Sequence, residues 1–273
     1  MKRIETELRL GTEPLTLLHI SDTHLCRADE RDNERKNALA VKRARIFPTA
    51  EEDYAESIRL ARESGTILCH TGDLIDFVSE ANLDAARQYA ANTDLFFAAG
   101  NHEFSQYVGE AWEDADYRNQ SLPRVQACFG NDIRFSARQV GGLNLVAIDD
   151  SYYRFEPEQL AALKAEAAKG LPILLFLHNP LHEDALYTLM RTRAECAYLT
   201  GTPAPLLADY SDHRRRQQEA DAITDETIAY IRSEPCIKAI FSGHLHFDYE
   251  GVFGEHIPQF VTGIGTARRI KIL

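Results

Sequence analysis

Five short runs of apolar residues, each followed at once by a polar cluster, constrain the fold of this chain most strongly. The runs cover residues 15–20, 66–70, 95–99, 171–177 and 237–241, and the clusters that follow them read SDTHL, TGDLID, GNHE, HNP and SGHLH. Apolar runs of this length predict buried β-strands. Helical patterns lie between several of them, and alternation of strands with helices is typical of an α/β fold with largely parallel strands.

The segments between these runs predict three helices and one more strand. A capping-box sequence at residues 49–52 begins a helical pattern that ends at Gly65. A second helix is expected around residues 84–91, and a third runs from Pro157 to Gly170, since proline favours the first turn of a helix. Residues 143–148 are expected to form a strand.

Four segments lie outside this alternation. Residues 4–10 and the tail 251–273, with its glycine-rich turns, predict edge hairpins. Residues 104–134 and 181–219 have no clear place in a sheet, and loops of this length are usually functional. We therefore expect one domain spanning residues 1–273, with lid-like inserts at these two places.

Composition excludes several classes of partner. With 44% apolar and 26% charged residues, the chain resembles ordinary soluble globular proteins. Its net charge of −12 repels nucleic-acid phosphates, so no nucleic-acid partner is expected, and the one basic cluster, residues 214–216, is interpreted as a solvated helix face. No leader segment or membrane-spanning stretch is apparent, and five scattered cysteines suit a reducing compartment. We expect a cytoplasmic protein without membrane contact; the oligomeric state stays open.

The polar clusters carry residues that commonly bind metals. Because carboxyl ends of neighbouring strands converge on one crevice, residues that are far apart in sequence are expected to meet there. Oxygen and imidazole donors without a thiolate suit Mn, Fe or Zn, and a shared carboxylate can bridge two such ions. The residues of metal-binding type in these clusters are Asp22, His24, Asp73, Asn101, His102, His178, His244 and His246.

Local charge indicates the kind of ligand that such a site attracts. Two divalent ions contribute +4, the carboxylates of Asp22 and Asp73 contribute −2, and a bridging hydroxide contributes −1, which leaves the site at about +1. Screening over roughly 8 Å makes this local sign outweigh the charge of the whole chain. A phosphate is therefore expected to bind at the site.

The five clusters together resemble the calcineurin-like metallophosphoesterase family. In this sequence they read D-x-H from Asp22, G-D-x-x-D from Gly72, G-N-H-E from Gly100, a lone His178, and G-H-x-H from Gly243, in the order typical of the family. The resemblance implies a four-layer α/β/β/α sandwich of two mixed sheets flanked by helices. It also implies an enzyme, a metal-dependent phosphoric ester hydrolase.

The resemblance also assigns a role to each residue. One metal would be held by Asp22, His24 and His246, and the other by Asn101, His178 and His244. Asp73 would bridge two divalent or mixed-valence ions, namely Mn, Fe or Zn. The catalytic pair would be His102, which assists the leaving group, and Asp76, which orients it, while a metal-bridging hydroxide attacks the phosphorus.

The expected substrate is a small phosphate ester, with a small-molecule or nucleotide-like phosphodiester favoured. Protein phosphatases of the family have an arginine after the second aspartate of G-D-x-x-D, where this chain has Phe77. A phosphomonoester phosphatase and a non-catalytic scaffold of the same fold remain alternatives. An amidohydrolase is disfavoured because its H-x-H pair is expected on an early strand. The substrate could also contact an insert through Tyr187, Arg191, Arg193 and Tyr198, although an exposed helix explains these residues equally well.

Each site residue also has a plain structural interpretation. Alone, Asp22 could cap a helix, Asp73 and His178 could belong to turns, and Asp76 could cap the segment after it. Other residues near the clusters keep such interpretations. These are His19 and His70 as buried supports, His182 as a loop residue, His213 and His256 as surface residues, Cys26 as a thiol outside the ligand set, and Glu103 as a support for the loop of His102.

Overall fold

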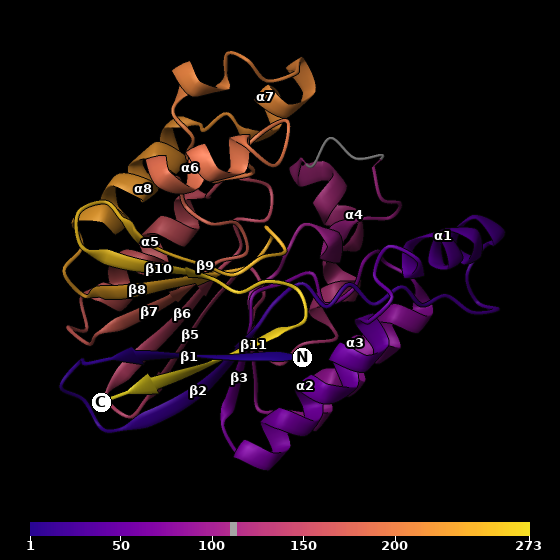
Figure 1. Cartoon of the computed structure of the whole chain (residues 1–273), viewed down its shortest axis with the longest axis horizontal. Coiled ribbons are helices and arrows are strands. Elements are labelled where there is room, and N and C mark those ends of the chain that lie inside the picture. The colour runs from indigo at the N-terminus through magenta and orange to yellow at the C-terminus, as the bar shows by residue number, and fades with distance from the viewer. Residues whose placement is uncertain (110–113) are drawn as a thin grey trace.

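The computed structural model describes residues 1–109 and 114–273 and contains two mixed β-sheets (Figure 1). The first sheet has the order β1-β11-β2-β3-β4, formed by β1 (Lys2–Leu8), β11 (Thr266–Ile272), β2 (Leu15–Ile20), β3 (Ile67–His70) and β4 (Leu95–Phe97). The second has the order β5-β6-β7-β8-β10-β9, formed by β5 (Phe135–Val140), β6 (Leu143–Ile148), β7 (Ile173–Phe176), β8 (Ile237–Ser242), β10 (Ile257–Val261) and β9 (Tyr249–Phe253). The strands that precede the five polar clusters occupy adjacent positions in their sheets.

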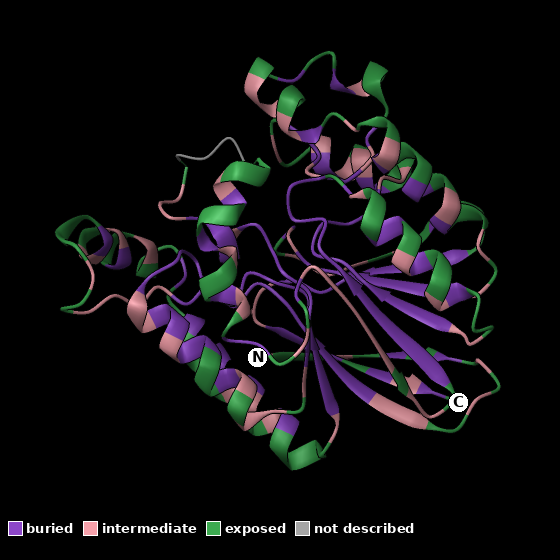
Figure 2. Ribbon diagram, turned by 180° about the vertical axis from the view of Figure 1, so that it is seen from behind, coloured by how far each residue is buried: buried purple, intermediate pink, exposed green. Residues whose placement is uncertain are grey.

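Helices cover the outer face of each sheet. Helices α2 (Ala50–Ser64) and α3 (Glu80–Asn92) pack against the first sheet, and α5 (Pro157–Ala167) and α8 (Ala222–Ser233) pack against the second (Figure 1). The central strands β3, β6 and β7 are buried along their lengths, whereas the outward sides of these helices are exposed (Figure 2). This arrangement confirms the α/β class and the expected layering of two mixed sheets between helices.

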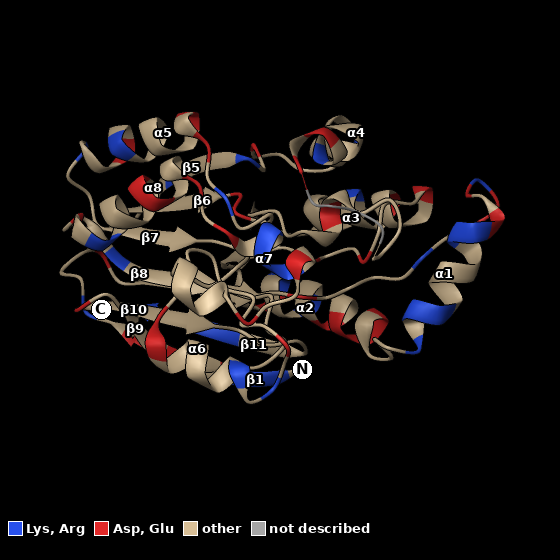
Figure 3. Ribbon diagram, turned by 90° about the horizontal axis from the view of Figure 1, so that it is seen from above, with Lys and Arg blue, Asp and Glu red and all other residues tan. Residues whose placement is uncertain are grey.

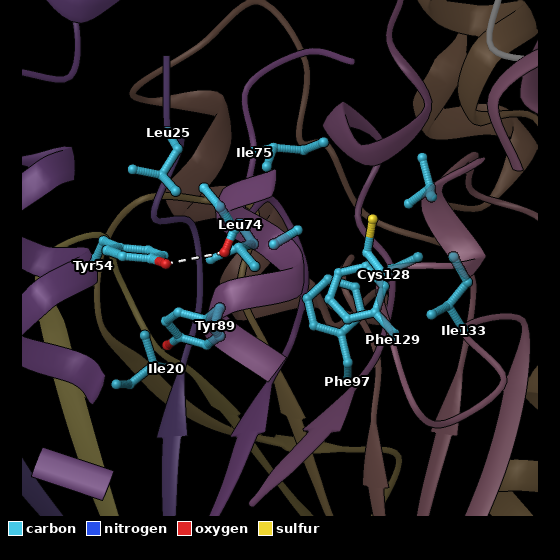
Figure 4. Close-up of a cluster of buried hydrophobic side chains, with 14 of the residues drawn as sticks. Ile20, Leu25, Tyr54, Leu74, Ile75, Tyr89, Phe97, Cys128, Phe129 and Ile133 are labelled. Carbon is cyan, nitrogen blue, oxygen red and sulfur yellow. Dashed lines mark hydrogen bonds between the residues drawn. The ribbon is translucent and has the colours of Figure 1, made fainter. Parts of the chain in front are cut away.

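Three apolar cores hold the layers together. Between the sheets, Leu17 and Phe96 from the first meet Leu174 and Phe241 from the second. One outer core lies between the first sheet and its helices, where Phe97 stacks on Phe129 with ring centroids 3.9 Å apart (Figure 4). The other outer core lies beneath α5 and α8. Because the central strands are buried on both faces, β6 and β7 read as nearly continuous apolar runs in the sequence.

The described part of the chain contains four more α-helices, of which α4 (Ala115–Gln126) adds Val125 to the outer core of the first sheet. The other three are α1 (Glu34–Ala44), α6 (Asp184–Arg191) and α7 (Asp212–Gln218). Helix α4 belongs to the segment 104–134, of which residues 110–113 lie outside the described residues, and α6 and α7 belong to 181–219. Their action as lids and the one-domain organisation stay predictions. Among the described helices, none combines the length and the apolarity that crossing a membrane requires.

Some local predictions are wrong in detail. At Thr49 the backbone is already helical and the side chain makes no capping bond; its hydroxyl donates to Asp53 instead, so no capping box forms. Helix α3 begins earlier than expected because Ser79 caps it by accepting the Asn82 N–H. The end of α2 is as predicted, since Gly65 takes the left-handed conformation that glycine adopts without a steric penalty.

The chain termini pair differently from the predicted edge hairpins. Strands β9 and β10 do form an antiparallel hairpin, with β9 at the edge. Strand β1, however, pairs in parallel with β11, and β11 lies between β1 and β2. Hairpin patterns are local, whereas these partners come from opposite ends of the chain, so the periodicity of either segment does not indicate its partner.

Candidate metal centre

Unusual backbone conformations mark the loops that follow the strands. Within residues 1–109 and 114–273, seven non-glycine residues have a positive φ, and five of them belong to the predicted ligand set. The five are Asp22 (55°), His24 (51°), Asp73 (54°), His244 (68°) and His246 (59°). Such conformations cost energy in ordinary residues and cluster at functional sites. They turn the side chains of separate loops toward one region.

Two glycines allow these loops to approach each other. A Cβ added to Gly72 would lie 2.2 Å from the backbone nitrogen of Gly100, and one added to Gly243 would lie 1.7 Å from Ser21 Oγ. Both distances are shorter than any side chain permits. The glycines of the G-D and G-H motifs are therefore required for the close approach of neighbouring loops.

A first group joins Asp22, His24 and His246. Asp22 Oδ1 lies 3.8 Å from His24 Nε2 and 3.5 Å from His246 Nε2, and the two imidazole nitrogens are 3.0 Å apart. His24 and Asp22 are buried, whereas the side chain of His246 is 41% exposed. Their ligand atoms lie within 4.8 Å of one another, close enough to hold one metal ion.

A second group joins Asp73, His178 and His244. Asp73 Oδ2 lies 3.3 Å from His178 Nε2, which in turn lies 3.1 Å from His244 Nδ1. Asn101 belongs beside this group, since the Gly100 backbone next to it approaches both Asp73 and His178. Oδ1 of Asn101 is buried and has no hydrogen-bond partner within the described part of the chain. A buried, unpartnered acceptor is unfavourable unless a cation binds it.

Asp73 lies between the two groups. Its Oδ2 is also 3.5 Å from His24 Nε2 of the first group, while its Oδ1 accepts the backbone N–H of His102 at 2.9 Å. One carboxylate oxygen is thus fixed by the backbone and the other faces imidazoles of both groups. This is the position that a bridging carboxylate requires.

The geometry fits metal ions. Two nitrogens that bind one ion at about 2.1 Å and at a right angle are about 3.0 Å apart, which matches the pairs His24–His246 and His178–His244. In addition, the donors are carboxylate, amide and imidazole, and none is a thiolate. The structure therefore brings together all seven residues that the sequence predicted as ligands.

Contacts behind the imidazoles hold them in a fixed orientation. His178 Nδ1 lies 2.6 Å from the carbonyl oxygen of Thr71 and donates to it, which leaves Nε2 as the acceptor. His24 Nδ1 lies 3.0 Å from Asp76 Oδ1, and His244 Nε2 lies 2.7 Å from the hydroxyl of Tyr153. The Thr71 carbonyl and the Asp76 carboxylate only accept, so they select the tautomers of His178 and His24 that present Nε2 lone pairs to the site, while the Tyr153 hydroxyl holds the ring of His244 in place.

The charges of the site explain its pKa shifts. Burial alone would lower the pKa of His178, but the carboxylates of Asp73 and Asp22 and the Thr71 carbonyl together outweigh burial and raise it to about 10. Conversely, burial would raise the pKa of Asp73, but the surrounding histidines hold it below its usual range. The carboxylates thus strongly favour positive charge here, whether it is carried by protons or by metal ions that displace them.

His102 and Asp76 form a neighbouring pair. His102 Nδ1 lies 2.7 Å from the backbone oxygen of Asp76 and 3.2 Å from its Oδ1. Burial alone would lower the pKa of His102, but the carboxylates of Asp73 and Asp76 outweigh it and raise the pKa to about 10. His102 therefore holds a proton beside the metal-ligand groups, and Asp76 lies where an orienting residue is needed.

Sequence reasoning did not identify Arg43, which pairs with Asp76. From the end of α1, its Nε and Nη2 donate to the two carboxylate oxygens at 2.6 and 2.8 Å. Since Asp76 is fully buried, this guanidinium balances its charge, and it also occupies the carboxylate that would otherwise complete a third metal group with His24 and His102. A single arginine 33 residues earlier in a helix gives no signal of this contact.

Glu103 supports the loops, as the sequence interpretation expects. It is fully buried, and its carboxylate accepts four backbone N–H groups: those of Asp73 and Gly100, both at 2.7 Å, and those of Leu74 and Ile75 at 2.8 and 3.3 Å. Two adjacent loops, one with Asp73 and one with Asn101, are thereby fixed to a single side chain.

The buried histidines outside the ligand set are held by hydroxyl groups. His19 lies between Thr71 and Thr262, with both contacts at 2.9 Å, and His70 contacts Thr23 at 3.1 Å. Burial lowers the pKa of His70 to about 3, so it is neutral at physiological pH. Both serve as supports behind the site, and neither belongs to a metal-ligand group among the described residues.

A cavity of about 380 Å³ lies over the two groups. Asp73, Asn101, His102, His244 and His246 line its base. Its walls come from both inserts and from the loop after β6, through Ser105, Val108, Tyr153, Met190, Tyr198, Arg214 and Gln217. A ligand that fills this cavity would therefore contact residues of both inserts.

Of the four insert residues singled out in the sequence, only Tyr198 lines this cavity. Tyr187 donates its hydroxyl proton to the Leu206 carbonyl, while Arg191 and Arg193 lie over the rings of Tyr210 and Phe247. Arg214, by contrast, lines the cavity, although the sequence analysis interprets residues 214–216 as a solvated helix face.

Comparison with known proteins identifies the family. Residues 15–248 match the profile described as calcineurin-like phosphoesterase. The chain belongs to this family. Its members are metal-dependent hydrolases of phosphate esters, and the two donor groups described above have ligand atoms close enough together to hold metal ions. No curated protein sequence matches this phosphoesterase significantly.

Solved structures show the same fold at low sequence identity. A dimetal phosphatase from Danio rerio aligns with a TM-score of 0.53 and 13% identity, covering 92% of this chain and 87% of that one. The phosphopantetheinyl hydrolase of Mycobacterium tuberculosis aligns with a TM-score of 0.45 and 14% identity, covering 93% and 91%. The likeness to the Danio rerio phosphatase supports the fold of the phosphoesterase and leaves its substrate to be argued from its own residues.

Proposed function

We propose that this phosphoesterase hydrolyses a small phosphate ester with two metal ions, Mn, Fe or Zn. One ion is assigned to Asp22, His24 and His246, and the other to Asn101, His178 and His244. The observation that carries the proposal is the place of Asp73 Oδ2, 3.5 Å from His24 Nε2 and 3.3 Å from His178 Nε2, where it can bridge the ions.

The chain's own groups have distinct roles in this reaction. When bound, the two ions polarise the phosphoryl oxygens and lower the pKa of the water that attacks phosphorus. Protonated His102 lies at the base of the cavity and donates its proton to the leaving oxygen, as a general acid. Asp76 accepts a hydrogen bond from His102 Nδ1, and Nε2 of the same ring is therefore directed away from Asp76. Because Asp73 Oδ1 binds the His102 backbone, the acid and the bridging carboxylate keep a fixed spacing.

A phosphodiester is the favoured substrate, with a phosphomonoester as the alternative. A diester needs room on both sides of the metals, and the cavity has walls on both sides: Ser105 and Val108 from one insert, and Tyr198 and Arg214 from the other. Its volume of about 380 Å³ is at the lower end of small-molecule sites, which favours a compact or nucleotide-like ester.

The cytoplasmic location also stays a proposal. The cysteines Cys26, Cys69, Cys128, Cys196 and Cys236 are all unpaired. Free thiols are typical of a reducing compartment and support this assignment.

The test combines metal analysis with matched substrates. Protein purified without chelator is expected to hold two ions per chain, and to cleave bis(p-nitrophenyl) phosphate faster than p-nitrophenyl phosphate when supplied with Mn, Fe, Zn or Mg. Asp73→Asn should bind fewer than two ions and lose at least 10³-fold in kcat/KM, which is a loss of about 4 kcal/mol. Asp184→Asn, whose side chain is 99% exposed, is the matched control and should behave as wild type.

Two outcomes would contradict the proposal. Fewer than two ions in the wild-type protein, together with no hydrolysis of either ester, would favour the scaffold alternative. Undiminished hydrolysis by metal-loaded Asp73→Asn would refute the bridging role. Faster cleavage of the monoester would replace the diester preference by the phosphatase alternative and leave the metal centre intact.

A further inference from the structure

The three arginines at residues 214–216 do not share one environment. Helix α7, with Ser211 as its N-cap, lies over the middle of the molecule when this is seen from above, with blue arginine positions along it (Figure 3). Arg215 is exposed and pairs with Asp212 in its own helix at 2.9 Å. Arg214, one residue earlier, turns inward and lines the cavity over the metal-ligand groups. Arg214 therefore faces the cavity, where a ligand can contact it, whereas Arg215 faces solvent.

Three contacts hold the Arg214 guanidinium in place. Its Nε donates to Glu195 and its Nη1 donates to Gln217, both at 3.0 Å, and its Cζ lies 5.1 Å from the centroid of the Tyr198 ring. The Tyr198 centroid lies 5.9 Å from that of His244. These two distances place the guanidinium carbon no more than about 11 Å from the His244 ring. A substrate of moderate length can therefore reach both.

The contacts leave the cationic group available to the cavity. Guanidinium has five N–H donors, and two of them are used by Glu195 and Gln217. Glu195 is 62% exposed and is not among the described residues that line the cavity, so the positive member of the pair faces inward and the negative member faces out. Solvent screens the exposed Glu195 carboxylate more than the half-buried guanidinium, so the pair keeps part of its positive field on the cavity side.

The wall of the cavity carries little competing charge. Among the described residues that line it, Asp73 is the one with a carboxylate, and it belongs to the metal-ligand groups at the base. Tyr153, Tyr198 and Gln217 form the wall around Arg214 and are uncharged polar residues. A chain of net charge −12 that places a fixed arginine here favours an anion at this point of its cavity.

We propose that Arg214 is a specificity-determining residue that binds a second anionic group of the substrate, apart from the phosphate that is hydrolysed. The proposal rests on the proposed function and narrows its substrate class: the organic part on the α7 side ends in a carboxylate or phosphate. Arginine suits either group, because its planar fork donates two parallel hydrogen bonds to paired oxygens.

Equilibrium binding of phosphonates tests the proposal, since the enzyme cannot cleave a carbon–phosphorus bond by ester hydrolysis. We compare carboxyalkylphosphonates with one to five methylene groups against alkylphosphonates of equal length, by calorimetry on the Mn-loaded protein. At the best-fitting length the carboxylate should improve Kd about tenfold, the effect of one charge-assisted interaction. Alkane bisphosphonates of the same lengths show whether carboxylate or phosphate is preferred as the second group.

Variants of the two adjacent arginines distinguish a direct contact of Arg214 with the ligand from a general effect of positive charge on α7. The ratio to follow is the Kd of the alkylphosphonate divided by the Kd of the carboxyalkylphosphonate of equal length. In Arg214→Gln this ratio should fall to within twofold of one. Arg214→Lys should keep part of the preference, because lysine supplies a point charge. Arg215→Gln removes the same charge from the same helix and should keep the full ratio. Thermal unfolding of each variant checks that α7 remains folded.

Several results would overturn the proposal. They are a ratio near one in the wild-type protein at every length, an unchanged ratio in Arg214→Gln, or an equal loss in Arg215→Gln. An equal loss of affinity for both phosphonates in Arg214→Gln would assign the residue to the hydrolysed phosphate and would also overturn it. Because no catalysis is measured, an intact ratio in a protein that hydrolyses no ester would refute the proposed function alone.

Discussion

Replacing Glu103 by glutamine tests whether one buried carboxylate holds the metal-ligand loops together. Oε2 accepts the N–H groups of Asp73 and Gly100, both at 2.7 Å, and Oε1 accepts those of Leu74 and Ile75 at 2.8 and 3.3 Å. Glutamine has one acceptor oxygen and one amide group that only donates. Whichever way it is oriented, the amide group must face two backbone donors.

The cost of Glu103→Gln follows from these four bonds. A buried N–H without an acceptor costs about 1–3 kcal/mol, so two of them cost about 2–6 kcal/mol. Part of this cost is offset because a neutral amide is easier to bury than a carboxylate. Burial and the nearby Asp73 charge both disfavour the Glu103 carboxylate and raise its pKa to about 7. The expected net loss in free energy of unfolding is about 2–4 kcal/mol. For a chain of this size that lowers the Tm by roughly 5–10 °C.

Thermal unfolding of metal-free protein measures this loss, and calorimetric titration with Mn measures its effect on the site. Because Glu103 fixes the loops of Asp73 and Asn101, the variant should also bind metal more weakly. Glu52→Gln, at an exposed position of α2, controls for the loss of a carboxylate. A Tm within about 1 °C of the wild type, with unchanged metal affinity, would refute the reasoning.

Three further predictions concern the catalytic pair and the metals. His102→Ala should slow hydrolysis of esters with poor alkyl leaving groups by about 10²–10⁴-fold and p-nitrophenyl esters much less; equal losses in a leaving-group series would contradict the general-acid role. Arg43→Met leaves the buried Asp76 carboxylate without its guanidinium and should destabilise the protein by about 3 kcal/mol. The loss should largely disappear on an Asp76→Asn background, and a double-mutant cycle without coupling would contradict the ion pair. Removal of metal by a chelator should lower the Tm reversibly, by the equivalent of about 2.7 kcal/mol where the free metal had been at 100 times its Kd; an unchanged Tm would exclude linkage between metal binding and folding.

The sequence predicts the donor groups well because their chemistry and position are both local. Each donor directly follows an apolar run, and parallel strands bring their carboxyl ends to one edge. Asp22 and His246 are 224 residues apart, yet both follow this rule and their side chains lie 3.5 Å apart. Their assignment as ligands stays a prediction, but their proximity is a finding of the structure.

The groups behind the donors could not be predicted in this way. Arg43 reaches Asp76 from the end of a separate helix, and the Tyr153 hydroxyl contacts His244 from 91 residues away. Neither follows a motif, because the contact depends on how α1 and the loop after β6 pack. The pairing of β1 with β11 has the same cause: both strands suit many partners, and only the assembled sheet selects one.

The inward turn of Arg214 escaped the sequence because α7 offers no hydrophobic pattern. Its residues read DHRRRQQ, so no apolar position distinguishes an inner from an outer face. The structure orients the helix through polar contacts instead: Gln218 is buried, accepts the Tyr198 N–H at 3.1 Å and donates to Cys196. A glutamine so placed fixes the face that Arg214 presents to the cavity.

Backbone strain links the fold to the chemistry of the site. Five predicted ligand residues adopt positive φ, at a cost of about 1–3 kcal/mol each, and such a cost persists only where surrounding contacts outweigh it. Glu103 supplies four of these contacts, and the His244 N–H donates to both oxygens of Asp22, at 3.1 and 2.8 Å. Several donors thus double as backbone anchors. A substitution in the ligand set should therefore disturb the loops as well as the ions, so metal affinity and stability must be measured together to separate the two effects.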